Sequence, residues 1–252
     1  MIRIEKATKS YSGTRVVDSV TTTIPAGGVT SIIGPNGAGK STLLSLISRL
    51  SPMDSGSVSI AGLDVTSTPS KDLARSMAIL RQENHITMRL RVRDLVGFGR
   101  FPHSGGHPTA LDQEHIESAM AQLDLSALAD RFLDELSGGQ RQRAYIAMVL
   151  AQDTDYLLLD EPLNNLDMKH SVEMMRMIRR LADELGKTVV IVIHDINFAS
   201  CYSDTILAMR EGALVHQGTP AEIMTGEVLR DIYDIDIRIE EIDGNRIGVY
   251  FA

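Results

Sequence analysis

The chain has 252 residues, 43% of them apolar and 23% charged, and a formal net charge of −8. This length is enough to bury the core of one large domain. No run of Lys and Arg reaches the roughly five to eight residues of a basic patch, so nucleic acid is not an expected partner. The single cysteine, Cys201, excludes an internal disulfide and fits a reducing compartment.

The N-terminal part alternates strand-like and helix-like stretches. Residues 1–6 alternate apolar and polar side chains as a strand does, and they contain no apolar signal-peptide core. Leucine and isoleucine recur on one stripe of residues 40–50, Leu50 included, which predicts a helix. Further strands are predicted at residues 15–24, 29–33, 57–65 (a pair around Gly62) and 77–80.

The pattern changes after residue 82. Helix-like stretches and polar loops follow up to about residue 150, including a Gly- and His-rich turn at residues 101–107. We interpret residues 83–150 as a helical subdomain inserted into an α/β core. The whole chain, residues 1–252, is then a single domain.

The core resumes with two continuous apolar runs, residues 156–160 and 188–193, as expected for strands buried on both faces of a parallel sheet. A helix is predicted between them at residues 171–185. Strands are predicted at residues 205–209 and 213–216. Residues 226–252 are predicted as a short C-terminal extension of helix and hairpin, with the hairpin turn at Asp243-Gly-Asn245.

The most specific motif is Gly34-Pro-Asn-Gly-Ala-Gly39-Lys40-Ser41, between a predicted strand and a predicted helix. In this context the spacing forms a phosphate-binding loop, because glycines let backbone N–H groups converge on phosphate oxygens at a helix N-terminus. Lys40 is expected to reach the β- and γ-phosphates, and the Ser41 hydroxyl to hold Mg²⁺. The alternative, a Gly-rich turn without a ligand, is disfavoured by the complete spacing. The predicted ATP contacts are Gly34, Pro35, Asn36, Gly37, Ala38, Gly39, Lys40, Ser41 and Thr42.

Polar residues follow three other predicted strands. Asp160 is placed to hold Mg²⁺ and Glu161 to polarise an attacking water. His194 follows the strand at residues 188–193 and could sense the γ-phosphate, and Gln82 could touch Mg²⁺ or water and report to the insert. Each alone could be an ordinary polar strand end. Because α/β sheets bind ligands at the carboxyl edge, we expect them to meet there.

A second Gly-rich motif, Leu136-Ser-Gly-Gly-Gln140, lies downstream of the phosphate loop, at a predicted helix start. With the motifs above, in this order, it resembles the signature sequence of the ATP-binding cassette (ABC) ATPases. The resemblance extends from near the N-terminus to about residue 225. It implies the P-loop NTPase fold of that family: a mostly parallel sheet, an N-terminal antiparallel β region and an inserted helical subdomain.

The same resemblance implies a homodimer in which each ATP lies between one subunit's phosphate loop and the other's signature. Tyr11 matches the aromatic residue that stacks on adenine. Asp167 matches a residue linking the two sites. Asn164 and Asn165 stand where many members have small residues, and this departure leaves the contacts beside Asp167 open. The residues expected to contact ATP across the interface are Ser137, Gly138, Gly139 and Gln140.

Within this family, a chain with one cassette and no fused membrane segment, as here, resembles the ATPase of a bacterial importer. That resemblance implies a peripheral place on the cytoplasmic face of the cell membrane, permease partners, and an extracytoplasmic substrate-binding protein as an indirect partner. Gly99-Arg-Phe-Pro-His103 resembles a segment common in ferric-siderophore, haem and vitamin B12 importers. Residues 161–170 and 193–198 are similar to siderophore ATPases of the catecholate, petrobactin-like group. Apolar runs such as residues 189–193 are far too short to cross a bilayer.

Alternative functions remain open besides siderophore import. The cargo could be haem, vitamin B12 or another metal complex. A soluble ABC protein of DNA repair, Fe–S assembly or ribosomes often carries tandem cassettes, coiled-coil insertions or basic surfaces, none of which the sequence shows. A single-cassette ATPase of Fe–S assembly remains an alternative. A sensor without turnover would need a degenerate base, whereas Lys40, Glu161 and His194 are all present. The other histidines have no metal-ligand spacing and are interpreted as structural or surface residues: His85, His103, His107, His115, His170 and His216.

Overall fold

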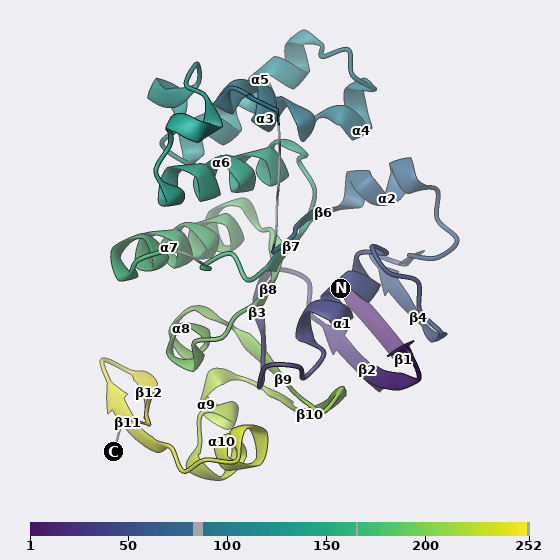
Figure 1. Cartoon of the computed structure of the whole chain (residues 1–252), viewed down its shortest axis with the longest axis vertical. Helices are drawn as coiled ribbons and strands as arrows, with labels where there is room; N and C mark the ends of the chain where they lie inside the picture. Colours follow the sequence, from purple (N-terminus) through teal and green to yellow (C-terminus); the bar gives the residue numbers. More distant parts are fainter. Residues whose placement is uncertain (83–87, 165, 251–252) are drawn as a thin grey trace.

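The computed structural model describes residues 1–82, 88–164 and 166–250. Its centre is a six-stranded sheet in the order β10-β9-β3-β8-β7-β6 (Figure 1). The bounds are β3 Gly28–Ile33, β6 Met77–Leu80, β7 Tyr156–Asp160, β8 Thr188–Val192, β9 Thr205–Arg210 and β10 Ala213–Gly218. All neighbours pair in parallel except β10, which pairs antiparallel with β9. Every residue of β7 and β8 is buried, as their continuous apolar runs predicted.

A second sheet is antiparallel, in the order β2-β1-β4-β5. Its strands are β1 Ile2–Tyr11, β2 Thr14–Ile24, β4 Ser55–Ile60 and β5 Leu63–Asp64. It packs with α1 (Lys40–Ile47) against one face of the six-stranded sheet, to the right in Figure 1. Alternate residues of β8 show the division: Val190 and Val192 join that cluster, while Val189 and Ile191 face the helices on the other side.

Helices cover the other face of the six-stranded sheet. The insert contributes α3 Val92–Phe98, α4 Phe101–Ser104, α5 Ala110–Gln122 and α6 Gly138–Ala151, with short 3₁₀ turns at Ser126–Leu128 and Leu133–Glu135. Below them in Figure 1 lie α7 (Met168–Leu185) and α8 (Ile196–Tyr202). The buried Met174, Met175 and Met177 of α7 pack into this core. Within the described ranges, no helix combines the length and apolar character needed to cross a bilayer.

The described part of the predicted helical subdomain, residues 88–150, contains helices and loops. Its only pairing of strand type is an isolated bridge between Arg91 and Phe132. The predicted start at residue 83 lies outside the described residues. At the other end of the chain, α9 (Pro220–Ile223) and α10 (Gly226–Tyr233) precede the predicted hairpin, β11 Arg238–Ile242 and β12 Asn245–Val249. The turn is shorter than predicted, because Asn245 already belongs to β12.

Two predicted helix ends were wrong. Helix α1 stops at Ile47 and not at residue 50: the Ser48 hydroxyl bonds to the Leu44 carbonyl, and Arg49 takes a left-handed φ of 58°. Leu50, placed on the apolar stripe from sequence, is therefore 49% exposed. Helix α7 starts at Met168, earlier than predicted, because the Asp167 carboxylate accepts the backbone N–H of His170 and caps it.

Two other elements differ from the sequence analysis. The turn predicted at residues 101–107 contains the single-turn helix α4, which Gly105 ends with a φ of 60°. Helix α2 (Ser70–Ser76) was not predicted. It leads directly into β6, and this junction becomes important below.

Candidate nucleotide site

The four predicted site segments lie at one edge of the six-stranded sheet. The parallel register aligns β3, β8, β7 and β6, because Thr188 pairs with Gly28 and Tyr156, and Tyr156 pairs with Met77. Their carboxyl ends therefore emerge side by side. The phosphate loop follows β3, His194 follows β8, Asp160 ends β7, and Gln82 follows β6. The sheet brings together what the sequence separates.

The phosphate loop requires glycine at its two ends. Gly34 has a φ of 143°, and a Cβ there would lie 2.1 Å from the carbonyl oxygen of Met209. Gly39 has a φ of 94°, and a Cβ there would lie 2.2 Å from the carbonyl oxygen of Val16. No other residue type fits either place without moving the backbone of β9 or β2. The motif's outer glycines thus set the loop's close packing on the fold.

Lys40 lies inside this loop. Its ammonium group donates to the carbonyl oxygens of Gly34 and Pro35, at 2.9 Å each, and the residue is 5% exposed. Burial lowers the pKa of Lys40, and the nearby Glu161 and Asp160 carboxylates oppose that shift. The loop therefore holds a buried cation next to its own backbone, which favours an anionic ligand.

Ser41 and Asp160 form a pair of hard oxygen groups. The Ser41 hydroxyl donates to Asp160 Oδ1 at 2.8 Å. Burial raises the pKa of Asp160, and the bond from Ser41 partly opposes this. Mg²⁺ prefers oxygen ligands and usually takes only one or two from protein carboxylates, the rest coming from water and phosphate. The pair therefore fits Mg²⁺, whose charge would also offset the burial of the carboxylate.

Glu161 is held by three side chains. Gln82 and Asn164 donate amide N–H groups to its Oε2, at 2.8 and 2.5 Å, and His194 Nε2 lies 2.8 Å from its Oε1. The Glu161 side chain is 9% exposed and that of His194 44%. Gln82, predicted as a Mg²⁺ contact, therefore directs its amide nitrogen to Glu161. This arrangement fixes the carboxylate's orientation at the rim of the phosphate loop.

Tyr11 lies at the end of β1 with its ring accessible. The residue is 48% exposed, its hydroxyl lies 3.2 Å from the Ser51 hydroxyl, and Lys9 Nζ is 5.4 Å from the ring centroid. An accessible aromatic face is what adenine stacking requires.

The second motif forms the start of α6. The Ser137 hydroxyl accepts the backbone N–H of Gln140 at 3.2 Å, and the Gln140 side chain accepts that of Ser137 at 3.0 Å. This capping box leaves Ser137 and Gly138 exposed at a helix N-terminus, which favours anions. Gly139 is buried under His170, and the packing is close: a Cβ on Gly139 would lie 2.7 Å from the His170 ring.

Comparison with known proteins agrees with this geometry. A family described as "ABC transporter" matches residues 17–164. The petrobactin import ATP-binding protein YclP of Bacillus subtilis is 55% identical over 252 residues, all of both chains. The petrobactin import ATP-binding protein FatE of Bacillus anthracis is 52% identical over 99% of this chain and all of its own. This chain belongs to the ABC transporter family.

Solved structures show the same fold. The dimeric structure of the ATP-binding cassette MJ0796 bound to ADP and Pi is 28% identical, with a TM-score of 0.77 over 87% of this chain and 99% of its own. The predicted fold class, a P-loop ABC core with an antiparallel β region, is confirmed. The chain is an ATP-binding ABC ATPase, as its motifs indicated.

The structure of this ABC ATPase shows contacts at the site for three residues to which the sequence assigned no role there. Asn164 supplies a second amide to Glu161, and His170 packs on Gly139 while its Nδ1 lies 2.7 Å from Asp167. Tyr233 of α10 lines a cavity of about 290 Å³ beside residues 35–38 of the phosphate loop. Neither spacing nor periodicity signals these contacts, since each joins segments far apart in the chain or depends on side-chain direction. Asn165, named with Asp167 above, lies outside the described residues.

Proposed function

We propose that this chain is the ATP-hydrolysing subunit of an ABC importer whose cargo is an iron–siderophore complex of the petrobactin type. The observation that carries the proposal is the full-length 55% identity to a petrobactin import ATP-binding protein. A nucleotide site with every expected group present supports it. Relatives named for petrobactin favour this cargo over haem or vitamin B12.

ATP binding is proposed to use the phosphate loop and Tyr11. The adenine would stack on the exposed ring of Tyr11, and loop residues 34–42 would bind the phosphates through backbone N–H groups. Lys40 would exchange its two loop carbonyls for the β- and γ-phosphates, a charge-assisted contact that is stronger than the neutral one it replaces.

The Mg²⁺ ligands are proposed to be Ser41 and Asp160, with the side-chain oxygen of Gln82 as a further contact. Mg²⁺ neutralises charge on the β- and γ-phosphates during phosphoryl transfer. The Gln82 amide nitrogen donates to Glu161, and its amide oxygen is the atom that would bind Mg²⁺ or a water. Because this one side chain would contact both the metal and Glu161, its position would report the state of the nucleotide to the insert.

Glu161 is proposed as the general base. Water attacks the γ-phosphorus, the bond from that phosphorus to the ADP oxygen breaks, and the water proton passes to the Glu161 carboxylate. ADP and inorganic phosphate result. His194, 2.8 Å from Glu161 and partly exposed, is placed to orient this carboxylate and to contact the γ-phosphate. The amide of Asn164 would help to hold the same carboxylate.

The active unit is proposed to be a homodimer with two shared sites. Helix α1, which follows the phosphate loop, packs on one face of the sheet, and α6, which follows the signature, packs on the other. A phosphate bound by one chain's loop is thus better placed to meet the signature of a second chain. Ser137, Gly138 and Gly139 would contact it there, with Gln140 holding Ser137. Asp167, bonded to His170 against Gly139, would link the two sites.

The permease is proposed to dock on the insert. There Phe98 and Phe101, 48% and 63% exposed, line a groove of about 780 Å³. Exposed aromatic side chains around a groove are typical of a protein interface. Docking would place the chain at the cytoplasmic face of the membrane, with an extracytoplasmic substrate-binding protein as an indirect partner.

Uptake of radiolabelled ferric petrobactin by a strain lacking this gene tests the proposal. Uptake should fall, return with the wild-type gene, and stay low with Glu161→Gln. In that variant ATP would close the dimer, but without hydrolysis the dimer would not reopen for another transport cycle. Unchanged petrobactin uptake alongside lost uptake of haem or vitamin B12 would contradict the cargo. Full uptake with Glu161→Gln would instead contradict the role of the base.

A further inference from the structure

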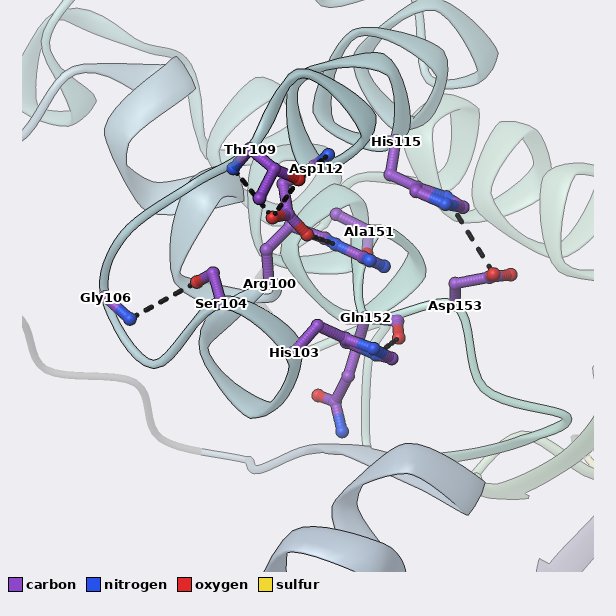
Figure 2. Close-up of polar contacts among 10 residues, drawn as sticks. All are labelled: Arg100, His103, Ser104, Gly106, Thr109, Asp112, His115, Ala151, Gln152 and Asp153. Carbon is purple, nitrogen blue, oxygen red and sulfur yellow. Dashed lines mark hydrogen bonds and ion pairs between the residues drawn. The ribbon is translucent and has the colours of Figure 1, made fainter.

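The polar side chains of the segment 99–103 point into the protein and complete the end of α6 (Figure 2). Arg100 Nη1 donates to the carbonyl of Ala151 at 2.9 Å, and His103 Nε2 donates to that of Gln152, also at 2.9 Å. The last carbonyls of a helix have no partner within it, so these two bonds satisfy the C-terminal end of α6. The segment also packs tightly, since a Cβ on Gly99 would lie 2.0 Å from the Met148 carbonyl oxygen.

Gln152 connects this helix end to the start of β6, the strand that leads to the nucleotide edge of the sheet. While its carbonyl accepts His103, its side-chain amide donates to the carbonyls of Ala74 and Met77, at 2.6 and 3.0 Å. Those two residues belong to the junction of α2 and β6. Strand β6 then leads to Gln82, which donates to Glu161. One residue therefore joins the insert, the end of α6 and the strand that leads to Gln82.

The same short segment has an outer, apolar side. Phe98 and Phe101 flank Gly99 and Arg100, and both line the groove described above. The polar side chains are thus used for internal contacts, and the aromatic ones are left on the surface. A partner that displaces the aromatic side chains would also displace Arg100 and His103, which are only a few residues away along the backbone.

We infer that His103 and Gln152 are positioning residues that make α6 and β6 respond together to a partner docked on Phe98 and Phe101. Helix α6 runs from the signature to Gln152, about 21 Å at 1.5 Å per residue, and β6 runs to Gln82. Without the His103 bond, Arg100 still holds the Ala151 carbonyl, but the segment loses its bond to Gln152, the residue that holds the start of β6. The inference rests on the permease docking proposed above, but not on the identity of the cargo.

The test compares three substitutions of His103. The side-chain nitrogen of His103→Gln lies near the place of imidazole Nε2 and can still donate to the Gln152 carbonyl. His103→Asn has the same amide at the shorter reach of Nδ1, and His103→Ala has none. His115→Ala is the matched control. That histidine lies in the same cluster, but its contact is a 3.8 Å approach of Nδ1 to the Asp153 carboxylate and not a bond to Gln152 (Figure 2).

Each variant is purified twice, as the free chain and as the complex that co-purifies from membranes with a tag on this chain. The readout is the ATPase rate of the complex divided by that of the free chain. His103→Ala and His103→Asn should lower this ratio about threefold to tenfold, the range in which single residues modulate coupling. The basal rate of the free chain should stay within about twofold, because no catalytic group is touched. His103→Gln and His115→Ala should keep the wild-type ratio.

A wild-type ratio for His103→Ala overturns the inference, as does a ratio for His103→Gln as low as that for His103→Asn. If His103→Ala fails to fold, the Asn and Gln variants decide by themselves, because they share chemistry and differ in reach. If the ATPase of the wild-type complex exceeds that of the free chain but cells that make this complex take up no ferric petrobactin, the proposed cargo is contradicted. The coupling is then still judged by the ratio.

Discussion

The buried ion pair within the insert allows a quantitative prediction for Asp112→Asn. Arg100 Nε donates to Asp112 Oδ1 at 2.8 Å, and the two side chains are 4% and 5% exposed. The backbone N–H and the hydroxyl of Thr109 donate to Asp112 Oδ2, at 2.9 and 2.8 Å. Asparagine keeps the size and can still accept from Thr109, but it removes the negative charge facing Arg100 (Figure 2).

The expected loss of stability follows from these contacts. The Thr109 backbone bond, followed by the Arg100 bond, lowers the pKa of Asp112 from 3.8 to about 2. At about 1.36 kcal/mol per pKa unit, this difference corresponds to about 2 kcal/mol of folding free energy at neutral pH. Removing one partner of a buried pair costs about 3–5 kcal/mol when the other charge is left alone. Arg100 keeps the Ala151 carbonyl, so we expect about 2–3 kcal/mol.

Urea unfolding of the wild type and Asp112→Asn at several pH values measures this difference. A depressed carboxylate pKa contributes stability that is complete above the unfolded pKa and is lost as pH falls towards the folded pKa. The difference between the two proteins should be full at pH 7, and about half should be gone near pH 3. Asp18→Asn is the control, because Asp18 pairs with Arg15 where both side chains are exposed, 41% and 65%. It should change stability by less than about 1 kcal/mol.

A difference for Asp112→Asn no larger than for Asp18→Asn would refute this reasoning. So would a difference that grows as the pH falls from 4 to 3. The first result would mean that the buried pair contributes no more than a surface pair. The second would mean that Asp112 is not the group whose titration sets the difference.

Four further predictions concern the nucleotide site. Lys40→Ala should lower ATP hydrolysis at least about a hundredfold by removing a principal electrostatic group, and near-normal turnover would contradict the phosphate-loop assignment. Glu161→Gln should bind ATP without turnover and become dimeric with Mg-ATP in light scattering; a monomer at saturating ATP would argue against the shared site. Ser137→Arg should still bind ATP as an isolated chain but not hydrolyse it, and loss of binding would count against its action across the interface. Burial raises the pKa of Asp160, so its charged form lowers the stability of the fold at pH values above that pKa. Asp160→Asn should therefore raise the thermal midpoint of the ATP-free protein at pH 7, and this gain should shrink as the pH falls through the raised pKa. A lower midpoint for the variant at pH 7 would contradict the prediction.

Local patterns in the sequence predicted most element types and nominated the main candidate site residues. The spacing from Gly34 to Ser41, between an apolar strand and a helix, requires only neighbouring residues to form its loop. The runs ending at Asp160 and His194 are apolar on both faces, so they identify strands inside a parallel sheet. Because parallel strands end at one edge, the meeting of these residues could be predicted without coordinates.

The tertiary structure decided which partner each side chain takes. Sequence spacing does not show that Glu161 is held by Gln82, Asn164 and His194, because three separate segments contribute the contacts. The segment 99–103 was recognised only by resemblance, and its sequence does not tell which side chains turn inwards. That direction depends on where α6 ends, because the carbonyls of Ala151 and Gln152 have no partner within the helix and accept hydrogen bonds from Arg100 and His103. Element types follow from short-range periodicity, whereas these contacts form only when residues distant in sequence pack together.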